Sequence, residues 1–76
     1  MIDEIVELVR RLDGDGGCPS CAATIEIVDG SLVGVRPSRD QDQFDGPDLL
    51  VCLSCENGIR LVGPNRLPHA TLRISR

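Results

Sequence analysis

The sequence lacks the aromatic residues that usually fill the core of a small protein. Its 76 residues include no tryptophan, no tyrosine and a single phenylalanine, Phe44. A hydrophobic core at this length rarely supplies more than about 3–5 kcal/mol, so small folds commonly need a disulfide or a bound metal as well. The length allows one domain, over residues 1–76. We therefore expect one small domain whose stability depends on more than hydrophobic packing.

The sequence also lacks a long apolar run and a secretory leader. The longest apolar stretch, residues 49–53, is far shorter than the roughly 20 residues that span a bilayer. The first residues include Asp3 and Glu4 in place of the basic region of a signal peptide. We expect a cytoplasmic, reducing setting with no signal peptide or transmembrane segment. Cysteine pairs in that setting bind metal more often than they form disulfides.

Lysine is absent, and the charges that remain are distributed unevenly. All eight basic residues are arginines, and the net charge is −4. Residues 1–56 contain all twelve acidic residues and four arginines, a formal charge of −8. Residues 57–76 contain four arginines and no acidic residue, a formal charge of +4. This asymmetry indicates an acidic body with a basic C-terminal part that a partner could recognise.

An amphipathic helix is expected over residues 2–12. Its apolar residues recur at helical spacing, with acidic residues near the start and arginines at the end, as the helix dipole favours. The glycine-rich residues 13–17 would end it. A helix of this length is marginal alone, so it must pack on its own domain or on a partner. We expect the intramolecular packing.

The rest of the chain predicts β-structure with turns. A hairpin is expected from residues 23–28 and 32–36 around the turn at 29–31, followed by a polar loop over 37–48. Further strands are expected over residues 49–52, 58–62 and 70–75. The expected fold class is a small metal-stabilised β-rich domain of about five short strands with one N-terminal helix.

Four cysteines form the strongest motif in the sequence. Cys18 and Cys21 form one C-x-x-C pair, and Cys52 and Cys55 form a second after thirty intervening residues. Two such turns can place four sulfurs around one cation in a tetrahedral shell with metal–sulfur distances of about 2.3 Å. We expect one structural Zn²⁺ at these residues. Iron in the same shell, two disulfides or a thioredoxin-like redox pair are the alternatives.

With this spacing, residues 17–76 resemble the zinc-ribbon family, in which two cysteine knuckles grip one zinc. The resemblance implies a structural metal but does not specify the function, because zinc ribbons serve in transcription, in translation, in nucleotide enzymes and in assembly scaffolds. The family often has glycine after the second cysteine of each knuckle, whereas this sequence has Ala22 and Glu56. Rubredoxins, which bind iron and carry electrons, have similar spacing, but their cores are rich in aromatic residues and this chain has only Phe44.

Four further residues are candidates for contact with a partner. They are Phe44 in the polar loop and the arginines Arg60, Arg66 and Arg73. A lone His69 without a matched nucleophile indicates no catalytic site.

We expect a protein-interaction module or a structural subunit of a larger assembly, with a protein partner and no membrane. A nucleic-acid-associated regulator that uses the arginines is the alternative. A third possibility is that Arg60 and Arg73 pair with the chain's own carboxylates.

Overall fold

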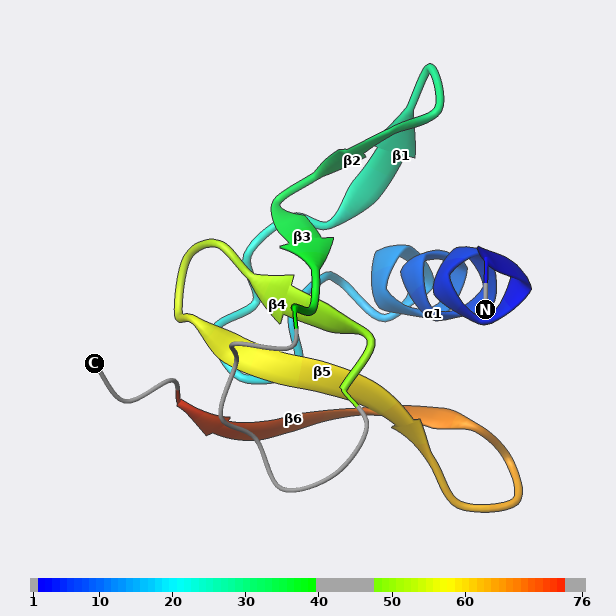
Figure 1. Ribbon diagram of the computed structural model, residues 1–76, viewed down its shortest axis with the longest axis vertical. Helices are drawn as coiled ribbons and strands as arrows, with labels where there is room; N and C mark the ends of the chain where they lie inside the picture. Colours follow the sequence, from blue (N-terminus) through cyan, green and yellow to red (C-terminus); the bar gives the residue numbers. More distant parts are fainter. Residues whose placement is uncertain (1, 40–47, 74–76) are drawn as a thin grey trace.

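The N-terminal helix α1 covers one side of the molecule (Figure 1). The computed structural model describes residues 2–39 and 48–73. α1 spans Ile2–Gly14, with Asp3 and Glu4 in its first turn, and continues two residues beyond the expected end. It ends where the N–H of Gly17 donates to the carbonyl of Leu12 at 2.6 Å, a bond that satisfies a carbonyl at the helix C-terminus. No helix in the described residues has the length and apolarity needed to cross a membrane.

Within residues 2–39 and 48–73, six strands form two antiparallel sheets. β1 and β2 pair as a two-stranded sheet that projects away from the body, and the other four form a sheet in the order β3-β4-β5-β6 (Figure 1). The strands are β1 (Glu26–Val28), β2 (Ser31–Val33), β3 (Val35–Pro37), β4 (Leu50–Cys52), β5 (Asn57–Val62) and β6 (Leu67–Arg73). The prediction of a small β-rich fold with one N-terminal helix is confirmed.

The number of strands differs from the prediction because Gly34 divides the expected strand over residues 32–36. Gly34 has a φ of 86°, and a Cβ atom at this position would collide with the carbonyl oxygen of Thr24. The chain therefore turns at Gly34, so that β2 pairs with β1 while β3 pairs with β4. The hairpin itself was correctly placed, with Asp29 and Gly30 as its two turn residues.

The last strand begins earlier than expected. β6 starts at Leu67, opposite Val62, and includes Pro68 and an exposed His69 that were expected in a turn. β6 pairs only with β5 among the described strands, so Pro68 can lack an N–H without losing a bond in the sheet. The turn is confined to four residues and ends at Arg66, which has a φ of 52°.

The core lies where α1 meets the strands and the first cysteine turn. α1 contacts β1 and β6, so the helix packs on its own chain as expected. Two of the four cysteines belong to the same buried cluster as the aliphatic side chains, which links the metal-binding motif to the core. The buried members are Leu8, Val9, Leu12, Cys18, Ile25, Val35, Leu50, Cys52 and Ile59.

Candidate metal centre

The first cysteine turn lies between α1 and β1. The N–H of Ala22 donates to the carbonyl of Cys18 at 2.8 Å, which closes the turn around Pro19 and Ser20. The N–H of Cys18 donates to the carbonyl of Ala23 at 2.9 Å. Gly17 precedes this turn with a φ of 108°, and a Cβ atom there would collide with the same carbonyl oxygen. Glycine at position 17 therefore lets the end of α1 approach the cysteine turn closely.

The second cysteine turn connects β4 to β5 and repeats the geometry of the first. The N–H of Glu56 donates to the carbonyl of Cys52 at 2.9 Å, the bond that corresponds to Ala22–Cys18. The N–H of Leu53 donates to the carbonyl of Gly34 at 2.9 Å and ties the turn to the start of β3. Both turns thus have the same closing bond and are anchored to neighbouring backbone.

The two residues that replace the usual glycines adopt the conformation that glycine favours. Ala22 has a φ of 60° and Glu56 has a φ of 63°, both in the left-handed region. A non-glycine residue in this region costs about 1–2 kcal/mol. The knuckle geometry is therefore retained without glycine, at the cost of backbone strain in each turn.

The four sulfur atoms lie close together. All four are within 4.8 Å of one another. The Sγ atoms of Cys18 and Cys55 are 3.7 Å apart, and those of Cys21 and Cys52 are 3.6 Å apart. A tetrahedral shell with metal–sulfur bonds of about 2.3 Å requires sulfur–sulfur distances of about 3.8 Å. A disulfide requires about 2.05 Å, and all four cysteines are free thiols in this structure.

Backbone N–H groups point at the sulfurs and affect their ionisation. The N–H of Ser20 donates to Sγ of Cys18 at 3.4 Å. The pKa of the exposed Cys21 thiol is lowered to about 7, mainly by a hydrogen bond from the backbone N–H of Ala23. Burial has the opposite effect at the other knuckle, where it raises the pKa of Cys55 to about 12. Burial also raises the pKa of Cys18.

These properties fit a bound metal cation. The pKa of a buried thiol rises because its negative form is poorly solvated, and coordination to a cation removes that penalty and deprotonates the thiol. Four sulfur ligands in a tetrahedral arrangement are typical of Zn²⁺ and of iron–sulfur centres. The structure thus brings together Cys18, Cys21, Cys52 and Cys55 as a site able to bind a metal.

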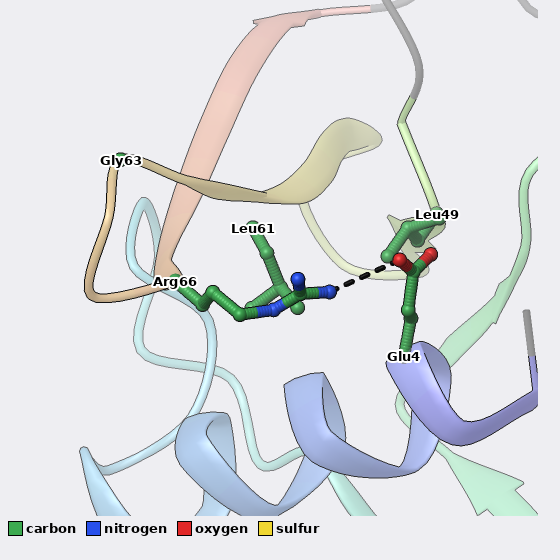
Figure 2. Close-up of a pocket in the computed structure, with 5 residues that line it drawn as sticks. All are labelled: Glu4, Leu49, Leu61, Gly63 and Arg66. Carbon is green, nitrogen blue, oxygen red and sulfur yellow. Dashed lines mark hydrogen bonds and ion pairs between the residues drawn. The ribbon is translucent and has the colours of Figure 1, made fainter.

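Two of the three candidate arginines contact carboxylates of the same chain. Arg66 extends from the β5–β6 turn to α1, where its Nη2 lies 3.0 Å from Oε1 of Glu4 (Figure 2). Its Nε lies 3.3 Å from Oε2 of Glu7. The Nε of Arg60 lies 3.9 Å from Oδ1 of Asp48, whose side chain is 0% exposed. The Arg60 contact agrees with the possibility that Arg60 pairs within the chain, whereas the ion pairs of Arg66 were not predicted.

The Arg66–Glu4 pair spans a small cavity between α1 and the β5–β6 turn. The cavity has a volume of about 240 Å³ and is lined by Glu4, Leu49, Leu61, Gly63 and Arg66 (Figure 2). Because both charged residues of the lining bind each other, this ion pair connects the helix to the sheet. Of the remaining candidates, Phe44 and the side chain of Arg73 lie outside the part of the chain that the structure describes.

A second, larger groove was not anticipated from the sequence. It has a volume of about 460 Å³ and lies between α1 and β1, lined by Val6, Val9, Arg10, Asp13 and Ile27. The helical spacing of apolar residues over 2–12 predicted an apolar face on the helix, but it could not show that β1 would leave part of that face uncovered. The exposure of Ile27 follows from the projection of the hairpin, which depends on the break at Gly34.

Comparisons with protein-family models, with curated proteins and with solved structures find no match to this chain.

Proposed function

We propose that the chain is a zinc-ribbon interaction module, a small non-enzymatic domain or subunit in which one structural Zn²⁺ maintains a rigid binding surface. The observation that carries this proposal is the pair of matched turns that place four sulfurs at near-tetrahedral spacing. Four protein ligands complete the shell of a zinc ion and leave no coordination position for substrate or water. When bound, zinc at such a site contributes about 10 kcal/mol or more of apparent folding free energy.

The site composition supports a structural role. In the described residues, the group of side chains positioned to bind a metal consists of cysteines alone, with no histidine or carboxylate. Two of its members, Cys18 and Cys52, are also part of the hydrophobic core. Metal binding would therefore stabilise the same residues that hold α1 against the strands. We also propose a reducing, cytoplasmic setting, where cysteine pairs bind metal more often than they form disulfides.

Exposed apolar side chains support a protein partner. In the described residues, the large hydrophobic side chains at the surface are Ile27, Val28, Val33, Leu53 and Leu67. Three of the five belong to the projecting β1–β2 hairpin, and apolar surface concentrated in this way is typical of interaction sites. The contacts of Arg60 and Arg66 with carboxylates make the nucleic-acid alternative weaker. Each guanidinium group already lies beside a carboxylate of the same chain, and a phosphate would have to compete with that contact.

Metal analysis combined with unfolding tests the structural role. We expect one zinc per chain after purification without added metal, and loss of the folded circular dichroism spectrum after chelation. Cys52→Ser should abolish both zinc binding and the cooperative unfolding transition, because it removes a buried ligand. Ser54→Ala, an exposed position in the same turn, is the matched control and should preserve both.

Two results would overturn the proposal. A Cys52→Ser variant with an unchanged melting temperature would show that the cluster does not hold a structural metal. A red protein with visible absorption and stoichiometric iron would instead support the rubredoxin-like electron carrier.

A further inference from the structure

The groove between α1 and β1 has an apolar floor and an open upper side. Val6 and Val9 of α1 and Ile27 of β1 form its apolar lining, and Arg10 and Asp13 contribute one charge of each sign. Ile27 is 39% exposed although it faces the helix side of the hairpin. The volume of about 460 Å³ lies in the range of sites that bind a small ligand or a few side chains.

β1 also has a free edge beside this groove. In the described residues β1 pairs with β2 only, and Figure 1 shows β1 on the side of the hairpin nearer to α1. The register pairs Val28 with Ser31 and Ile27 with Leu32 across a two-residue turn. In such a hairpin the pair that flanks the turn exchanges its hydrogen bonds, so the N–H and carbonyl of Ile27 point away from β2. They are available to an added strand.

The charges of the hairpin specify what kind of strand would fit. Residues 22–35 contain two acidic residues, Glu26 and Asp29, and no basic residue. No ion pair or hydrogen bond of either carboxylate is found within residues 2–39 and 48–73. Because side chains alternate along β1, Glu26 and Val28 lie on the face opposite to Ile27. A strand beside β1 would place alternate side chains over the groove and next to Glu26.

We propose that this groove binds an extended segment of a partner protein, with alternating apolar and basic residues, by addition of a third strand to the edge of β1. Its apolar side chains lie on Val6, Val9 and Ile27, and its basic side chains lie beside Glu26. This inference rests on the proposed function, because it names the partner surface of the interaction module. Strand addition supplies backbone hydrogen bonds for affinity and alternate side chains for specificity.

A second copy of the chain is a poorer occupant of the same edge. Pairing of two β1 strands would bring two Glu26 and two Asp29 side chains together with no basic residue from either hairpin. Like charges on adjacent strands are destabilising. A basic partner segment has the opposite effect, since it places a cation beside Glu26.

The test is a titration of the zinc-loaded protein with capped hexapeptides, followed by ¹⁵N–¹H NMR and amide exchange. The probe alternates valine and arginine, and its matched control alternates valine and glutamate. We expect the arginine peptide to shift the amide resonances of Glu26, Ile27 and Val6 and to slow exchange of the Ile27 amide. We expect the glutamate peptide to bind at least tenfold more weakly.

Two threonine variants at equally exposed positions locate the binding surface. Ile27→Thr should weaken binding of the arginine peptide about tenfold, because it removes apolar contact at the groove. Val33→Thr is the control, because Val33 has the same 39% exposure but lies on β2 and on the opposite face. It should change the affinity less than twofold.

The inference is overturned by equal binding of the two peptides, by equal effects of the two variants, or by no binding at millimolar peptide. Shifts confined to the cysteine turns or to Arg66, or dimerisation through β1 without peptide, would also overturn it. Zinc content and melting temperature measured on the same samples distinguish the two failures. If the chain keeps its zinc and its melting temperature but binds neither peptide, the proposed binding groove is wrong, whereas the structural zinc of the proposed function stands.

Discussion

Replacing Ala22 by glycine is expected to stabilise the metal-loaded protein. Ala22 is exposed and has a φ of 60°, so its methyl group adds backbone strain and little packing. Relief of this strain is worth about 1–2 kcal/mol, and the greater freedom of glycine in the unfolded chain offsets about 0.4–1 kcal/mol. The net gain, about 0.8 kcal/mol at the middle of these ranges, corresponds to a rise in melting temperature of about 3–6 °C.

The measurement is thermal unfolding followed by circular dichroism, at equal zinc concentration for each variant because bound metal shifts the transition. Ala23→Gly is the control. Ala23 follows directly, has no positive φ and packs partly against the core. Its replacement should lower stability by about 0.5–1 kcal/mol or more, since glycine there adds freedom to the unfolded chain and removes a methyl group that packs against the core. Shifts of the same sign at both positions would refute the assignment of strain to Ala22.

Three further predictions concern charge and protonation. Arg66→Gln should lower the free energy of unfolding by no more than about 1 kcal/mol at low salt. The difference in stability between the variant and the original chain should vanish in 1 M salt, which thermal unfolding at both salt concentrations would show. Zinc binding at pH 7 should release at least two protons per chain, because the raised pKa values of Cys18 and Cys55 keep both thiols protonated without metal. Zinc affinity should therefore fall at least a hundredfold per unit as the pH drops below 7, because Cys21 also becomes protonated there. Calorimetry in two buffers at each of several pH values would measure both the proton release and the fall in affinity. Asp48→Asn should lower the free energy of unfolding measured in urea by about 1–3 kcal/mol, because the buried carboxylate accepts a hydrogen bond and lies beside Arg60. The control, Asp29→Asn in the exposed turn, should change it by less than about 0.5 kcal/mol.

The parts of the fold that follow local patterns were predictable from the sequence. The spacing of apolar residues placed the helix, and the Asp29-Gly30 turn placed the hairpin. The cysteine pairs predicted the cluster, because two C-x-x-C turns have few arrangements other than a shared site. Each of these features depends on residues near one another in the chain or on a strong chemical preference.

The parts that depend on contacts between distant segments were not predictable. The division of the expected strand at Gly34 depends on the close approach of Thr24, which no local pattern shows. The contact between Arg66 and α1 joins residues more than fifty positions apart, so only the folded arrangement reveals it.

The position of the cysteine turns along the chain has a consequence for how this protein can be altered. The hairpin β1–β2 lies entirely between the two turns, and the four sulfurs close the loop that contains it. The entropy of closing a flexible loop grows only with the logarithm of its length, so doubling the loop costs about 0.6 kcal/mol. The sequence of the β1–β2 hairpin can thus be replaced by that of another hairpin. Its length and binding specificity can be redesigned while the ligands, the closing turns and the four-stranded sheet keep their sequence.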